Sequence, residues 1–137
     1  MEVDLALIAQ GGDFTGRGIH IFGGGVDTVG VSELPSALPP FAVVIRFARP
    51  AVSETERHEL TLVGINPVGE ERVLAEGVPF EFDPPPRTGR AKSYANVMIS
   101  VGLKVMHEGK YQFVISADGT EMKRLDMWVE DQSQATN

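Results

Sequence analysis

Hydrophobic and polar residues alternate along most of this chain, in short runs separated by Gly, Pro, Asn and Asp. A period of two is typical of β-strands, whose successive side chains point to opposite faces, whereas a helix needs a period near 3.6. We find no helical period longer than a turn or two, and no internal repeat. The pattern therefore predicts about eight or nine short strands.

The runs also predict which residues each strand turns inward. Residues 41–47 predict a central strand, because both faces of this run are largely apolar. A weaker strand is expected over residues 26–31. Two other runs predict inward faces at the start of the chain: Val3, Leu5, Leu7 and Ala9 in a first strand, and Ile19 and Ile21 in a second.

Turn residues punctuate these runs. Residues 66–69, Asn-Pro-Val-Gly, predict a hairpin turn, and Asp118-Gly119 predicts a type I′ turn with positive φ. Residues 83–90 contain three consecutive prolines, which cannot donate to a sheet ladder, so we expect an exposed loop. We expect the long run at 97–105 to pair directly with the strand at 111–117.

Many short strands with one apolar face each are stable as two packed sheets or as a closed barrel. The uneven strand lengths and connections favour the packed sheets. We therefore expect an all-β antiparallel sandwich, Ig-like or jelly-roll-like. It would form a single domain over residues 1–130, followed by a flexible polar tail at 131–137.

Composition excludes several classes of function. The 137 residues include no cysteine, which excludes disulfides and thiolate chemistry. A net charge of -7 repels phosphate backbones, so we expect no nucleic-acid partner. The first residues carry the acids Glu2 and Asp4, and the apolar run there is short. We therefore expect neither a signal peptide nor a membrane segment, and a cytoplasmic location.

Several features in order resemble one bacterial family. They are the glycine-rich GIHIFGGGVDTV at residues 18–29, Leu34-Pro35, the apolar run 41–47, and Glu-Gly-Lys-Tyr-Gln-Phe at 108–113 followed by Asp118-Gly119. This order is similar to that of DUF6941, a bacterial family of unknown function. The resemblance implies a small β-rich bacterial domain, and it supplies no catalytic or ligand-binding residues.

Catalytic and metal motifs are weak. The triple glycine at residues 23–25 lacks the Gly-Lys-Ser/Thr continuation of a phosphate loop, so it predicts a bend. His20, His58 and His107 are widely spaced, with no close ligand pair, and no Gly-x-Ser-x-Gly motif is present. We therefore expect no enzyme activity and no cofactor, and a His-based metalloenzyme is the least favoured alternative.

The outward residues suggest an interface. Alternation places Trp128 outward between inward Met127 and Val129, with Tyr94, Met98 and Val114 at comparable outer positions. Exposed aromatic residues mark interaction sites. Our leading hypothesis is therefore a non-enzymatic β-sandwich interaction module. It would self-associate as a homo-oligomer, or dock a protein partner, through a sheet face or edge. The alternative is that these residues are covered by the proline loop or by residues 34–40, or that a bulge breaks the alternation.

A second class of function is a small-ligand or carbohydrate-binding domain. The candidate residues are Asp13, Phe14, Asp27 and Asp83, which would gather at one end of the sandwich. No Asp-x-Asp-x-Asp run joins these acids into a calcium loop. The sequence leaves the ligand open.

Overall fold

The computed structural model describes residues 1–15, 18–86, 89 and 91–134. These residues form eleven strands, of which nine are four residues or longer, and one short 3-10 helix. The strands are β1 (Glu2–Thr15), β2 (Gly18–Gly24), β3 (Thr28–Val31), β4 (Ser36–Ala37), β5 (Phe41–Pro50), β6 (Glu56–Ile65), β7 (Glu71–Phe82), β8 (Lys92–Val101), β9 (Lys104–Val105), β10 (Gly109–Ala117) and β11 (Thr120–Asp131). In this part of the chain, no helix is long and apolar enough to cross a membrane.

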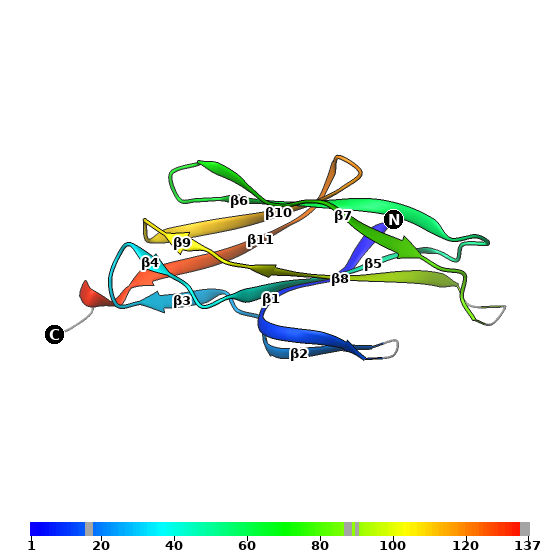
Figure 1. The fold of residues 1–137 in the computed structure, drawn as a ribbon, viewed down its shortest axis with the longest axis horizontal. Coiled ribbons are helices and arrows are strands. Elements are labelled where there is room, and N and C mark those ends of the chain that lie inside the picture. Colours follow the sequence, from blue (N-terminus) through cyan, green and yellow to red (C-terminus); the bar gives the residue numbers. More distant parts are fainter. Residues whose placement is uncertain (16–17, 87–88, 90, 135–137) are drawn as a thin grey trace.

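The strands form two packed sheets, and Figure 1 shows them as layers. One sheet has four strands in the order β2-β1-β5-β8, and the other has five in the order β3-β11-β10-β6-β7. Strands β4 and β9 form a small separate ladder. The pairs are antiparallel except β3 with β11, which is parallel. The predicted all-β sandwich is confirmed.

The inward faces of both sheets meet in one core. Residues 41–47 of β5 are almost fully buried, as their two apolar faces predict. Their inward side chains pack against the opposite sheet: the Phe41 ring meets Phe113 edge-on at 5.6 Å, and Phe47 stacks on Phe80 at 4.5 Å. Because β5 lies between β1 and β8, it anchors the four-stranded sheet to this core.

The expected single face of the first strand is wrong. The register of β1 against β5 shifts between Val3 and Leu5, as a β-bulge does. An extra residue reverses the alternation beyond it. Val3, Ala6 and Ile8 therefore pack in the main core, whereas Leu7 and Ala9 lie on the opposite face.

Beyond Ala9, β1 no longer pairs with β5 and pairs only with β2. This hairpin folds over the outer face of β5 and β8. Ile19 and Ile21 pack there against Ala42, Val44 and Met98, in a second small cluster rather than in the core. The hairpin hangs below the main layers in Figure 1. Val44 has no exposed surface although it points away from the core. The hairpin therefore explains why both faces of β5 are apolar.

Two predicted turns are confirmed. Asp118 and Gly119 both have positive φ, at 51° and 82°, and join β10 to β11. Between β6 and β7, the Gly69 N–H donates to the Asn66 carbonyl at 3.0 Å. The Asn66 side chain also accepts from the N–H groups of Val68 and Glu70, so it holds both sides of the turn.

The expected direct pairing of residues 97–105 with 111–117 is wrong. β8 pairs with β5, whereas β10 pairs with β6 and β11 in the other sheet. The run breaks after Val101 because the chain crosses between the sheets there, and β9 pairs with β4 on the way.

The expected tail at 131–137 differs from the structure at its start. Asp131 belongs to β11, and Gln132–Gln134 form the 3-10 helix. The Asp131 carboxylate accepts hydrogen bonds from the N–H and hydroxyl of Ser133, at 3.0 and 2.6 Å. Residues 135–137 lie outside the described part of the chain.

Candidate functional site

Trp128 lies on the outer face of the five-stranded sheet. Its neighbours Met127 and Val129 are buried in the core, whereas Trp128 is 50% exposed. The strand is paired on both sides here: Trp128 is opposite Lys110 of β10 and Thr28 of β3. Its N–H donates to the Asp27 carbonyl at 2.7 Å. The backbone is therefore held firmly while the indole faces outward.

Charged residues of both signs surround this tryptophan. Asp126 and Glu130, two residues to either side on β11, are exposed, and so is Lys110. The Asp126 carboxylate accepts from the Gln112 side chain at 3.3 Å. Lys110 and Glu130 make no ion pair with any described residue. They are available to charges outside this chain.

An apolar strip continues the same face toward β7. Val114 is opposite Val63, which in turn is opposite Val73. All three alternate with core positions and therefore point outward. Val73 is 54% exposed, whereas Val114 is only 8% exposed because its neighbouring strands flank it on both sides.

The four residues of the expected patch do not share one face. Tyr94 and Met98 belong to β8 of the four-stranded sheet, whereas Val114 and Trp128 belong to the five-stranded sheet. Tyr94 is 42% exposed, and Arg46 lies 3.9 Å above its ring. Met98 packs in the cluster under the β1–β2 hairpin. The structure brings only Val114 and Trp128 to the same outer face.

Three of the four expected ligand residues line two adjoining hollows. Asp27 lines a cavity of about 620 Å³, and Asp13 and Phe14 line one of about 410 Å³. The two cavities share three lining residues, Gln10, Pro40 and Phe41. Asp83 lies apart from them and accepts a hydrogen bond from the Thr55 hydroxyl at 2.9 Å. The four residues therefore do not gather at one end.

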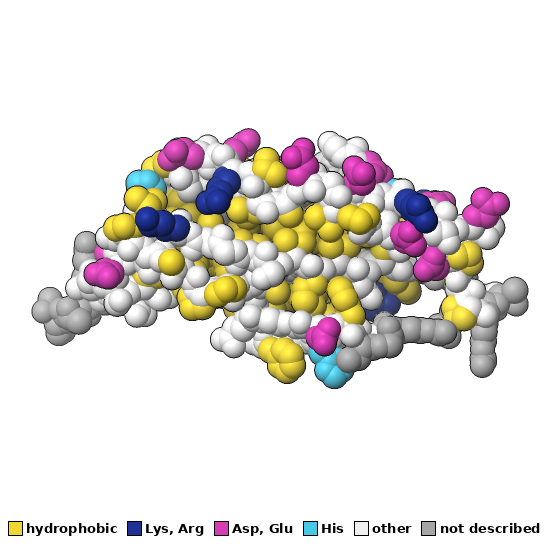
Figure 2. All heavy atoms as spheres, in the orientation of Figure 1, with side chains coloured by type: hydrophobic (Ala, Val, Ile, Leu, Met, Phe, Trp, Pro, Cys, Tyr) yellow, Lys and Arg dark blue, Asp and Glu magenta, His cyan; other side chains and the backbone are white. Residues whose placement is uncertain are grey.

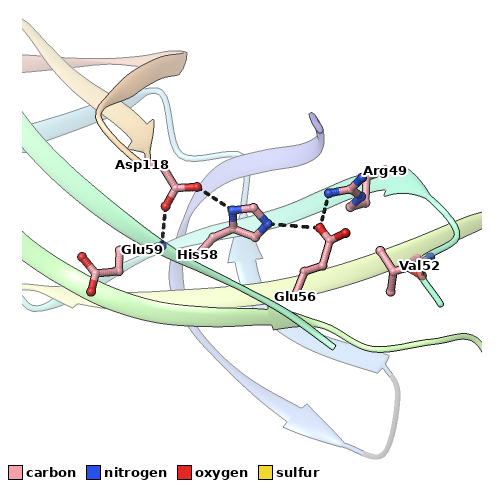
Figure 3. Close-up of polar contacts among 7 residues, drawn as sticks. Arg49, Val52, Glu56, His58, Glu59 and Asp118 are labelled. Carbon is pink, nitrogen blue, oxygen red and sulfur yellow. Dashed lines mark hydrogen bonds and ion pairs between the residues drawn. The ribbon is translucent and has the colours of Figure 1, made fainter. Parts of the chain in front are cut away.

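The sequence does not predict a cluster of polar side chains centred on His58. His58 Nδ1 lies 2.5 Å from Oδ2 of Asp118, and its Nε2 lies 3.6 Å from Oε2 of Glu56 (Figure 3). Glu56 also pairs with Arg49. The imidazole stacks on Phe80 at 5.4 Å and is 17% exposed. Asp118 and His58 are 60 residues apart, so no local motif indicates their contact.

The contacts of His58 and Asp118 favour a structural role for this cluster of polar side chains. Asp118 also accepts from the Glu59 N–H at 2.9 Å, so it ties the β10–β11 turn to β6. The hydrogen bond from His58, and then that from Glu59, lower the pKa of Asp118. Hydroxyl nucleophiles are activated by a hydrogen-bonded base, and no described Ser or Thr is bonded to His58. Among the described residues, no three His, Asp or Glu side chains form a metal site. His20 lies on β2, and His107 lies in the loop before β10.

Comparison with known proteins gives a family and a distant structural neighbour. No curated protein matches the chain. Among solved structures, the chain is similar to the Pseudomonas fluorescens alkylpurine DNA glycosylase AlkC bound to DNA containing an abasic site analog, with 6% identity and a TM-score of 0.49. The match covers 75% of this chain and only 27% of that protein. A family model matches residues 6–130, and the chain therefore belongs to DUF6941, a family of unknown function.

Proposed function

We propose that this chain is a non-enzymatic interaction module that binds a second copy of itself through the outer face of the five-stranded sheet. The observation that carries the proposal is Trp128, a half-exposed tryptophan on a held strand. The described strands form only this sheet, the four-stranded sheet that packs on its inner face, and the small β4–β9 ladder. Tryptophan is enriched at interfaces and dominates their binding energy.

The charges around Trp128 favour a second copy over an unrelated partner. In a two-fold symmetric dimer, each patch meets the same patch, so it must be complementary to itself. Among the residues that the structure describes, Lys110 and Glu130 offer one unpaired charge of each sign beside the indole. The strip of Val63, Val73 and Val114 lies on the same face, beyond the hydrogen-bonded pair of Gln112 and Asp126, and would add a second apolar contact. Within this proposal, the module works in the bacterial cytoplasm, which the cysteine-free sequence favours.

Size-exclusion chromatography with light scattering tests the proposal on wild type, Trp128→Ser and Tyr94→Ser. Tyr94→Ser is the matched control, because it removes an exposed aromatic from the other sheet. We expect a dimeric wild type, a dimeric Tyr94→Ser and a monomeric Trp128→Ser. A wild type that stays monomeric at high concentration would overturn the proposal, and so would a dimer that both variants leave intact.

A second candidate function is small-ligand binding at the two adjoining hollows. The larger cavity, about 620 Å³, falls within the range of about 300–1,000 Å³ typical of ligand sites. Asp27 in one hollow and Asp13 in the other offer oxygens to a cation or a sugar hydroxyl. Thermal shift with calcium and with a glycan panel tests it. Asp27→Asn should abolish any shift that originates there, and the absence of a shift would remove this candidate.

A further inference from the structure

A separate hollow of about 350 Å³ lies where the β6–β7 turn approaches β9 and the start of β10. Its apolar lining comes from Leu74, Leu103, Met106, Tyr111 and Phe113. Figure 2 shows hydrophobic side chains in the gap between the two sheets, with basic side chains beside them. The hollow thus opens onto the inner, apolar side of the sandwich rather than onto either outer face.

The bottom of this hollow is formed by apolar side chains. Phe113 and Tyr111 are buried, at 1% and 5% exposure, and Leu74 and Leu103 are partly buried against the core. The Tyr111 hydroxyl already donates to the His107 carbonyl at 2.8 Å. Gly64 contributes no side chain, and an added Cβ would lie 3.1 Å from Leu74. A ligand therefore meets hydrocarbon surface here.

Two free cations lie on the lining of the same hollow. Arg72 and Lys104 are exposed and make no ion pair with any described residue. Arg46, Arg49, Arg57 and Arg124, by contrast, all pair with an acid. In a chain of net charge -7, two unpaired cations beside one apolar hollow favour an anionic ligand.

The two acids of this lining form no ion pair with those cations among the described residues. Glu70 accepts from the Asn66 side chain at 3.2 Å within the turn. Glu71 is opposite Ile65, which is opposite Gln112 on the outer face. Arg72 is opposite Gly64, which is opposite the buried Phe113, so it occupies an inward position of the edge strand.

We propose that this hollow binds a small amphiphilic carboxylate, with its apolar body against Leu74, Leu103 and Phe113 and its carboxylate beside Arg72 and Lys104. The volume of about 350 Å³ lies at the small end of ligand sites and suits a medium-chain carboxylate. Charge-assisted hydrogen bonds from Arg and Lys supply the selectivity for the anion. The site is distinct from the Trp128 face.

Binding of octanoate, octan-1-ol and octyltrimethylammonium tests the ligand class, by calorimetry and by amide shifts in NMR spectra. We expect saturable octanoate binding, with shifts at Gly64 and Leu103, and weaker binding of the other two by about tenfold or more. Equal binding of octan-1-ol and octanoate would overturn the proposal, because it would show apolar partition alone. Failure of octanoate to bind at millimolar concentration would overturn it as well.

Charge reversal locates the site. Arg72→Glu and Lys104→Glu should each weaken octanoate binding about tenfold at low salt. Lys123→Glu is the matched control, because Lys123 is also exposed and unpaired among the described residues but does not line the hollow. Leu103→Trp, which fills the hollow, should abolish binding while circular dichroism stays native. If the lining reversals behave like the control, the carboxylate binds elsewhere and the proposal fails, whether or not the chain is a dimer.

Discussion

Asp118 shows how one residue can serve both a turn and a long-range contact. It adopts positive φ in the β10–β11 turn, which Asp tolerates better than most residues. Its carboxylate reaches back to His58 and to the Glu59 N–H on β6. The Asp118 N–H also donates to the Glu59 carbonyl at 2.9 Å. The turn is thereby fastened to the neighbouring strand.

We expect Asp118→Asn to lower the free energy of unfolding at neutral pH, because a neutral amide is a weaker acceptor than a carboxylate. The pKa of Asp118 is lowered in the folded state, so the carboxylate stabilises the fold above its unfolded pKa. That stabilisation is lost as the pH falls through the folded pKa. The difference between wild type and variant should therefore shrink below about pH 4.

Urea unfolding of both proteins between about pH 7 and about pH 3 measures this difference. Asp83→Asn serves as the control, because among the described residues its carboxylate bonds only to the neutral Thr55 hydroxyl. A difference for Asp118→Asn that stays constant over the whole range would contradict a charge-dependent role for this carboxylate.

At the scale of elements, the alternation of apolar and polar residues predicts the buried face of a strand better than it predicts which strands pair. The central strand and both turns follow from residues 41–47, 66–69 and 118–119, because local chain geometry determines them. The pairing of β8 with β5 depends on contacts between distant residues, such as Val43 with Ile99, 56 positions further along the chain, which no local pattern encodes. No local pattern shows the bulge after Val3 either. One extra residue there moves every later side chain of β1 to the opposite face.

In the candidate site too, the sequence predicts what one strand determines and does not predict what depends on how strands pack. Trp128 could be placed outward because Met127 and Val129 are apolar neighbours on a strand. Whether Tyr94 shares its face depends on which sheet β8 joins, and alternation within one strand does not contain that information. The contact of His58 with Asp118 and the hollow beside Arg72 arise only when distant strands are packed together.

Packing of the β1–β2 hairpin on the outer face gives a sharp test of that element. A Cβ at Gly12 would lie 2.7 Å from both the His20 carbonyl oxygen and the Met98 side chain. We expect Gly12→Ala to destabilise the protein by about 1–3 kcal/mol, as overpacking does. Gly11→Ala is the matched control, because nothing lies within 4 Å of a Cβ there.

Urea unfolding with both variants measures the difference, since the two substitutions add the same atom to adjacent residues. Equal stability of Gly12→Ala and Gly11→Ala would show that the hairpin is not packed closely on Met98.

At the scale of the whole molecule, the two sheets share one core. A single cluster of buried side chains includes β5 and β8 from one sheet and β6, β10 and β11 from the other. Each sheet buries its inner face only against the other, so neither retains a core when they separate. We infer that the described chain unfolds as one cooperative unit, as most domains of this size do.

Phe47→Ala tests this cooperativity, because Phe47 belongs to the four-stranded sheet whereas the single tryptophan, Trp128, belongs to the other. Phe47 is fully buried and stacks on Phe80, so its loss should cost about 3–5 kcal/mol. If the sheets unfold together, Trp128 fluorescence must report that full loss, at the same urea midpoint as far-UV circular dichroism. Phe22→Ala, which removes a ring that is 62% exposed, should leave both midpoints nearly unchanged. A urea midpoint of Trp128 fluorescence that Phe47→Ala leaves unchanged would mean that the five-stranded sheet is stable by itself. Its outer face could then present Trp128 without the rest of the sandwich.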